Sequence, residues 1–161
     1  MWKRQNFLGA GELRQFSYFH FAFNGLSIFC EVKKNMMHQF NRTMEYLESK
    51  LDAEVDLQQF QQLSGYSYAL FSRLFSILAD MTLAEYLRNR RLSEAVTDLR
   101  ESSEKVIDIA MKYGYESADA FSAAFKKFHG ATPSEVRNGK PYRVFPRLQL
   151  SLKITGGKNM D

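Results

Sequence analysis

The chain has 161 residues, of which 45% are hydrophobic and 25% charged, and its formal net charge is +4. This composition is ordinary for a globular protein and excludes a disordered tail, a collagen-like repeat and a disulfide-rich mini-protein. The single cysteine, Cys30, cannot form an internal disulfide and favours a reducing compartment. The charge is +3 over residues 1–35, −2 over 36–140 and +3 over 141–161. Nucleic-acid binding therefore has to be argued from the positions of particular residues rather than from bulk charge.

The first 35 residues are an aromatic-rich extension. Residues 16–30 read FSYFHFAFNGLSIFC, a stretch too short and too polar to span a membrane. The pair Asn24-Gly25 between alternating aromatic residues favours a β-hairpin. Alternatively, Met36-Met37 is the true start and residues 1–35 are not part of the native protein. The sequence leaves both interpretations open.

From Met36 onward the sequence pattern is helical. Apolar residues spaced three or four apart predict a first helix with the buried stripe Met37, Phe40, Met44, Leu47 and Leu51. Asp56, with Gln59 three residues later, marks the start of a short helix. Gly65 suits the left-handed residue at the end of that helix.

Two further helices follow. The first is expected over residues 67–78, with the core-facing stripe Phe71, Leu74, Phe75 and Leu78. Thr82 with Glu85 then caps a long helix that runs to about Glu101. The buried face of this long helix is expected to be Leu92, Ala95, Val96 and Leu99. About 20 helical residues span about 30 Å.

The helical pattern then repeats after 49 to 50 residues. The matching residues are Gly65 and Gly114, Tyr66 and Tyr115, Phe71 and Phe121, Phe75 and Phe125, and Thr82 and Thr132. Each copy reads as a short helix, a Gly-Tyr turn and a second helix. We therefore interpret the chain as two helix-turn-helix units joined by one long helix, with second helices over residues 67–78 and 117–128.

The second helix of such a unit enters the major groove of DNA and turns its exposed face to the base edges. In the first of these helices, the residues outside the core stripe form the outer face, and they are Tyr68, Ala69, Ser72, Arg73 and Ser76. In the second, they are Asp119, Ser122, Ala123 and Lys126, with Lys127 alongside. Because a helix of about 30 Å is close to one DNA turn of about 34 Å, the two units can reach successive major grooves.

Several motifs occur together within residues 37–140. They include Phe71-Ser72-Arg73-Leu74-Phe75, Arg90-Arg91-Leu92, Gly114-Tyr115-Glu116-Ser117 and Gly130-x-Thr132-Pro133. In this combination the chain resembles the AraC/XylS-type bacterial transcription regulators. The resemblance implies that bases are read by Ala69, Ser72 and Arg73 in the first unit and by Ala118, Asp119, Ala120, Ser122 and Ala123 in the second.

The chain departs from the family pattern at two informative positions. Ala123 stands where an arginine is common, so the second reading helix is expected to contribute backbone contacts and shape fit more than base reading. Asp80 replaces the usual glycine before Thr82, which is expected to loosen the first unit.

Other polar residues have two interpretations. Ser117 is the expected N-cap of the second reading helix, and the amides beside it could bind a phosphate. The arginines Arg88, Arg90 and Arg91 either contact phosphates or form ion pairs one turn apart, such as Arg90 with Glu94.

The tail has the pattern of a β-strand. Residues 143–155 read RVFPRLQLSLKIT, with alternating apolar and polar side chains. A single strand needs a partner sheet. The resemblance implies that this strand leads into a C-terminal GyrI-like ligand-binding domain, which we expect to be absent here; the N-terminal extension could instead supply the pairing strand.

Together these patterns predict an all-α fold: two helix-turn-helix subdomains joined by a linker helix, with a β-prone N-terminal extension and a C-terminal strand. The expected boundaries are 1–35 for the extension, 36–81 for the first subdomain, 82–101 for the linker helix, 102–140 for the second subdomain and 141–161 for the tail.

The predicted function is a cytoplasmic transcription regulator that binds double-stranded DNA and RNA polymerase. A small-molecule effector is expected to act only through the absent domain. No cofactor, metal, membrane contact or enzymatic activity is expected, because the histidines are far apart and lack metal-ligand spacing. The alternative is a helical protein-interaction module that contacts the transcription machinery without reading DNA. The net charge of −2 over residues 36–140 favours it modestly.

Overall fold

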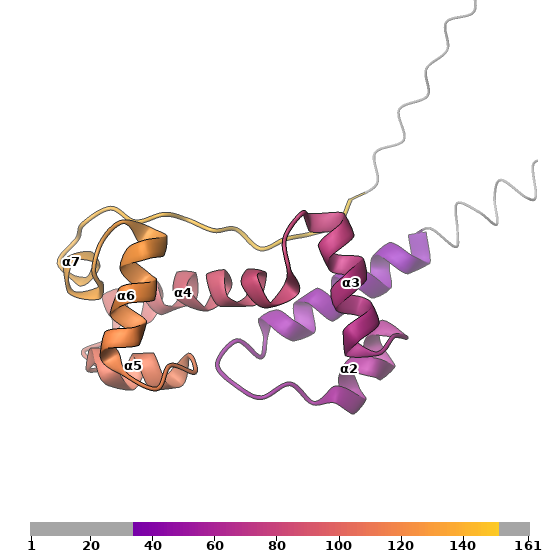
Figure 1. The fold of residues 1–161 in the computed structure, drawn as a ribbon, viewed down its shortest axis with the longest axis horizontal. Helices are drawn as coiled ribbons and strands as arrows, with labels where there is room; N and C mark the ends of the chain where they lie inside the picture. The colour runs from indigo at the N-terminus through magenta and orange to yellow at the C-terminus, as the bar shows by residue number, and fades with distance from the viewer. Residues whose placement is uncertain (1–33, 152–161) are drawn as a thin grey trace, which may run out of the picture. The chain divides into compact units, whose positions relative to one another are not determined.

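The computed structural model describes residues 34–151 (Figure 1). The chain divides into the units Met1–His38 and Gln39–Asp161. Residues 34–48 are helical. The helices that follow are α2 (Leu57–Ser64), α3 (Tyr68–Ala79), α4 (Leu83–Glu101), α5 (Val106–Lys112), α6 (Ala118–His129) and α7 (Pro133–Arg137). None of the helices in the described range is long and apolar enough to cross a membrane. The hairpin considered within residues 1–35 lies outside the described residues.

The expected all-α fold with two helix-turn-helix units is confirmed. Helices α3 and α6 have 12 residues each. Helix α3 begins one residue later than expected because Ser67 is its N-cap, and Ser117 is the N-cap of α6, as expected. The Ser67 hydroxyl oxygen accepts a hydrogen bond from the Leu70 amide at 3.3 Å, and that of Ser117 accepts one from the Ala120 amide at 3.1 Å. The same capping chemistry therefore sets the start of both helices.

Two aromatic cores lie on either side of one shared helix. In the first, the Phe71 ring stacks on Phe40 at 5.1 Å and meets Phe60 edge-on at 5.3 Å. In the second, Phe121 and Phe125 lie 5.4 Å apart. Helix α4 supplies Leu83, Tyr86 and Leu87 to the first core and Leu92, Ala95, Val96 and Leu99 to the second. The buried face predicted for the linker helix is confirmed, and α4 ties the two cores together.

The core stripe expected on α3 is wrong at one position. Phe71 and Phe75 are buried and Leu74 is half-buried, but Leu78 is 54% exposed. The last turn of α3 lies beyond the aromatic core, so both Ile77 and Leu78 face solvent. At the place in α6 that corresponds to Leu78, Phe128 is half-buried because the ring of Phe145 packs on it at 5.9 Å.

The expected C-terminal strand does not form in its described part. Residues 141–151, which we call the C-terminal strap, contain no strand or helix. Backbone groups of the strap form hydrogen bonds with side chains rather than with a neighbouring strand. The Asn41 amide donates to the Leu150 carbonyl at 2.9 Å and accepts from the Leu150 amide at 2.8 Å. The strap therefore lies against helices as a single extended segment, and residues 152–155 of the expected strand are outside the described range.

Groups of both helix-turn-helix units hold the strap. The hydroxyl oxygen of Tyr86 accepts from the Leu148 amide at 2.9 Å. At the other end, the His129 ring places Nδ1 3.0 Å from the Arg143 carbonyl oxygen and Nε2 3.0 Å from that of Leu92. The strap thus links the second unit back to the first.

A buried carboxylate organises the first unit. Glu48 accepts from the Tyr86 hydroxyl at 2.7 Å and from Nε of Arg90 at 3.0 Å. Burial raises the pKa of Tyr86, so its hydroxyl keeps the proton that it donates. Arg90 also donates to the Phe145 carbonyl at 2.7 Å and pairs with Glu94. The ion pair expected between Arg90 and Glu94 is therefore confirmed.

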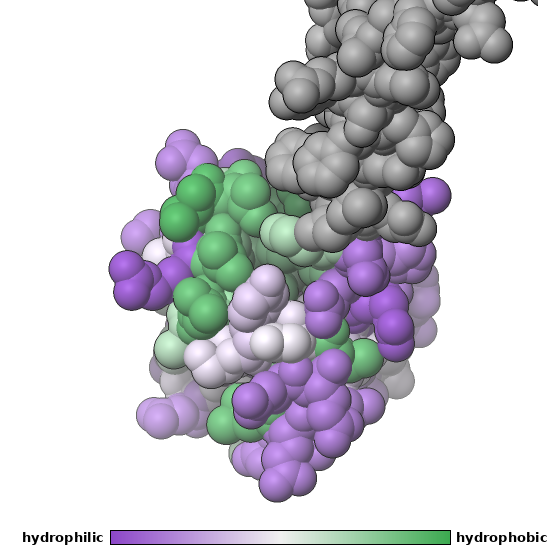
Figure 2. Space-filling view, turned by 90° about the vertical axis from the view of Figure 1, so that its right-hand side faces the viewer, coloured by the Kyte–Doolittle hydropathy of each residue, from purple (hydrophilic) through white to green (hydrophobic). Residues whose placement is uncertain are grey.

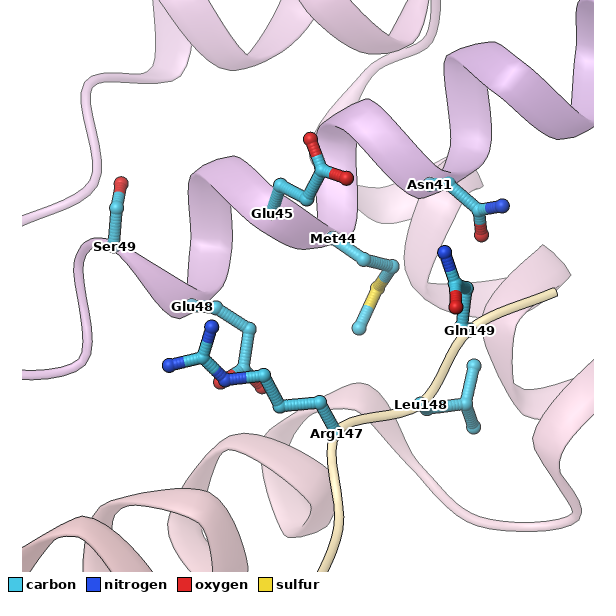
Figure 3. A pocket seen from close by; sticks show the side chains of 8 residues that line it. All are labelled: Asn41, Met44, Glu45, Glu48, Ser49, Arg147, Leu148 and Gln149. Carbon is cyan, nitrogen blue, oxygen red and sulfur yellow. The ribbon is translucent and has the colours of Figure 1, made fainter.

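A cavity of about 410 Å³ opens beside this carboxylate (Figure 3). Figure 3 shows Arg147 reaching from the strap toward Glu48, and the two form an ion pair at 3.3 Å. Glu45, one turn earlier on the same helix, also lines the cavity but is exposed. The neighbouring carboxylates of Glu45 and Glu48 therefore occupy very different environments.

We expect Glu48→Gln to lower the free energy of unfolding by about 3 kcal/mol, because it leaves the Arg90 guanidinium buried without its anionic partner. Urea unfolding measures the change. Glu45→Gln is the matched control, and as a surface change it should stay within about 0.5 kcal/mol of the wild type. Equal effects of the two substitutions would contradict the assigned role of Glu48.

The residue that ends α3 has a strained backbone. Asp80 adopts a left-handed conformation with φ of 52°, and Gly130 has φ of 77° at the same place in the second copy. This supports the expectation that Asp80 at a usual glycine position loosens the first unit.

We expect Asp80→Gly to raise the free energy of unfolding by about 0.5–1 kcal/mol, since glycine relieves left-handed strain but makes the unfolded chain more flexible. The reverse control is Gly130→Ala. A Cβ at Gly130 meets no atom within 4 Å, so the expected loss of about 1–2 kcal/mol reports backbone strain alone. Thermal unfolding of both variants measures these two changes in stability. A loss of stability in Asp80→Gly would contradict the assignment of backbone strain to Asp80.

Candidate nucleic-acid interface

Helices α3 and α6 stand at the two ends of α4 and run in a similar direction (Figure 1). Helix α4 has 19 residues, which corresponds to a length of about 28 Å. One turn of B-DNA is about 34 Å long. The separation is therefore compatible with two adjacent major grooves on one side of a duplex.

The residues expected to contact DNA on α3 all have accessible surface. Ala69 and Arg73 are exposed, Ser72 and Ser76 are half-buried, and Tyr68 is at the edge of exposure. The ring of Tyr68 also packs against Phe60 at 5.2 Å, so part of this side chain belongs to the core. Arg73 is the only one of these side chains with a charged donor group.

The two serines of α3 use their hydroxyl protons within the helix. Ser72 donates to the Tyr68 carbonyl at 2.8 Å, and Ser76 donates to the Ser72 carbonyl at 2.9 Å. Their oxygen lone pairs are left as acceptors. Such an oxygen suits the amino group of adenine or cytosine, whereas Arg73 suits the acceptors O6 and N7 of guanine.

The face of α6 has a different chemistry. Its expected contact residues are exposed or half-buried, and they are Ala118, Asp119, Ala120, Ser122, Ala123 and Lys126. The alanines offer methyl groups only, Asp119 would repel phosphates, and the cations Lys126 and Lys127 lie in the last turn. Ser117 lies just before the helix and caps it. This helix is therefore suited to shape and phosphate contacts more than to hydrogen bonding with bases.

The arginines of α4 separate into two groups. Arg90 is 4% exposed, so the alternative of a phosphate contact is wrong for this residue. Arg91 donates to the Leu51 carbonyl at 2.8 Å and is half-buried. Arg88 is exposed and is left as the arginine of this set best placed for a phosphate.

Sequence reasoning assigned no role to two exposed apolar residues of α3. Leu70 is 45% and Ile77 is 79% exposed. Comparison of the two copies would have pointed to Ile77, because its counterpart in α6 is the solvated Lys127. Figure 2 shows that apolar surface borders polar surface on the side of the molecule that it draws.

The chain has clear relatives. A family described as "Helix-turn-helix domain" matches residues 62–139. The chain is 34% identical over 105 residues to the regulatory protein SoxS of Salmonella typhimurium, which covers 64% of this chain and 98% of SoxS. It is 37% identical over 92 residues to the HTH-type transcriptional activator AarP of Providencia stuartii, covering 57% of this chain and 68% of AarP.

Solved structures give the same fold. An AraC-type transcriptional regulator from Chromobacterium violaceum matches with a TM-score of 0.55 and 21% identity, covering 62% of this chain and 89% of that one. The DNA-binding domain of AdpA, solved in complex with a target DNA, matches with a TM-score of 0.52, 21% identity and the same two coverages. From the extent of the match to SoxS and the helix-turn-helix domain over residues 62–139, the chain belongs to the AraC family of DNA-binding transcriptional regulators.

Proposed function

We propose that one copy of this chain binds one asymmetric DNA site, with α3 and α6 in successive major grooves. The observation that carries the proposal is that α4 contributes to both cores and carries one reading helix at each end. A dimeric repressor brings two such helices to DNA from two chains. Here a single chain supplies both, with different side chains on each.

We further propose a division of labour between the two units. In the first unit, Arg73 supplies a guanidinium that can donate two hydrogen bonds to one guanine. In the second unit, Ala118, Ala120 and Ala123 cannot make such a pair, whereas Lys126 can bind a phosphate. The first unit then sets most of the sequence preference, and the second mainly adds affinity.

The setting of this activity is also proposed. As a transcription regulator the protein would act in the cytoplasm, without a catalytic step, and would contact RNA polymerase. The description of AarP as a transcriptional activator supports such a contact. Control by a small molecule would act through a separate ligand-binding domain. The second candidate, a protein-interaction module that does not read DNA, is favoured only by the net charge of −2 over residues 36–140.

The binding mode predicts the footprint. A monomer should protect about 20 base pairs without a palindrome, because each reading helix covers one groove of a duplex. DNase footprinting on a duplex selected from a random library, combined with sedimentation of the complex, measures both properties. A palindromic site occupied only by a dimer would reject the binding mode. Binding that does not weaken as salt rises would instead favour the protein-interaction module.

The division of labour predicts two kinds of variant. Arg73→Ala should cost about 1–3 kcal/mol on the selected site and relax base choice in one half-site only. Lys126→Ala should weaken all sequences alike and reduce the salt slope by about one. Selection on randomised DNA with each variant measures the preference. Unchanged preference in Arg73→Ala would show that the first unit does not read bases through this side chain.

A further inference from the structure

We propose that Leu70 and Ile77 on α3 read the methyl groups of thymines that flank the base contacted by Arg73. This inference rests on the proposed function, because it requires α3 to lie in the major groove. It assigns a specificity role to exposed apolar residues that the helix-turn-helix fold does not need for its core.

The two side chains lie on the same face of the helix as Arg73. Leu70 precedes Arg73 by three residues and Ile77 follows it by four, and these spacings place side chains next to one another on a helix surface. Leu70 is 45% and Ile77 is 79% exposed. Together with Arg73, which is also exposed, they form a ridge that we call the Leu70–Ile77 ridge.

The major groove offers a partner for this ridge. It is about 12 Å wide, close to the diameter of a helix with its side chains, so both flanks of an inserted helix meet DNA. Its one distinctive apolar group is the C5-methyl of thymine. The ridge extends over about 10 Å of helix, or about three base pairs. Thymines are therefore expected on either side of the guanine within that distance.

The second copy provides an internal comparison. At the positions of Leu70 and Ile77, α6 has Ala120 and Lys127. Lysine at the second position can bind a phosphate, whereas isoleucine cannot, so the two helices cannot make the same contact there. The core-facing phenylalanines are the same in both copies. The differences at these two positions lie on the outer face, where they affect what the helix touches rather than how it folds.

The ridge is continuous with the residue that carries base reading, and this favours DNA over a protein as its occupant. Arg73 lies between Leu70 and Ile77 on the same face, so a protein bound to both apolar side chains would cover the arginine. In a helix that reads DNA through Arg73, both neighbours lie on the flank next to the arginine, within reach of the same groove.

The test removes single methyl groups from the DNA. The probe is a duplex selected by the full chain from a random library, and the first half-site is the one whose preference relaxes in Arg73→Ala. Each thymine of that half-site is replaced in turn by deoxyuridine, and Kd is measured by fluorescence anisotropy. For the wild type, loss of a contacted methyl should weaken binding about fourfold. Leu70→Ala should remove this loss of affinity at one thymine, and Ile77→Ala should remove it at another. Each variant should keep the loss of affinity at the thymine that the other residue contacts.

Met111→Ala is the matched control. Met111 is 65% exposed on α5, outside the reading helices, so this variant should keep both penalties. Circular dichroism and thermal unfolding check that all three variants keep the fold, as expected for exposed side chains.

Two results would overturn this inference and leave the proposed function intact. One is a selected half-site without thymine, or with no deoxyuridine penalty, within three base pairs of the guanine. The other is an unchanged penalty in both apolar variants, which would be expected if the ridge binds a protein. In both cases the Arg73→Ala effect would still stand. If the wild type selected no sequence at all, the proposed function would fail together with the inference.

Discussion

The buried ion pair of Glu48 and Arg90 is the interaction on which the arrangement of the first unit depends. Charges removed from water destabilise a protein unless their hydrogen-bonding capacity is used. Here Arg90 donates to Glu48 on the first described helix, to Glu94 on its own helix and to the Phe145 carbonyl on the strap. Because these partners come from three segments, the guanidinium fixes the N-terminal helix, α4 and the strap relative to one another.

That constraint has a consequence for DNA recognition. Helix α4 belongs to both cores, and the strap is held by His129 in the second unit and by Asn41 and Tyr86 in the first. The two helix-turn-helix units are thus joined by a helix and also by an extended segment of backbone. Two independent connections resist a change in helix spacing better than one, so a site of fixed half-site spacing suits this protein.

The sequence predicted what is determined locally. Caps such as Ser117 and Thr82, and the left-handed end at Gly65, depend on neighbouring residues and were found from their pattern. The burial of Arg90 could not be found in this way, because its partners lie 42 and 55 residues away. The strap was mistaken for a strand because alternating apolar and polar side chains show only that one side of an extended segment is buried. They do not show whether that side packs against a sheet or against helices. The exposure of Leu78 depends on where the core ends, which periodicity does not reveal.

The two copies divide their residues between packing and recognition. Inside, Phe71 and Phe75 match Phe121 and Phe125, because a close-packed core tolerates little change in volume. On the outer faces, the corresponding residues differ. Arg73 in the first copy corresponds to Ala123 in the second, and Ile77 corresponds to Lys127. A base edge and a phosphate need different side chains, whereas the buried phenylalanines are the same in both copies. One architecture, used twice, therefore presents an outer face with an arginine at one end of α4 and an outer face with alanines and lysines at the other. In the proposed binding mode, this chemical asymmetry within a single chain calls for an asymmetric operator.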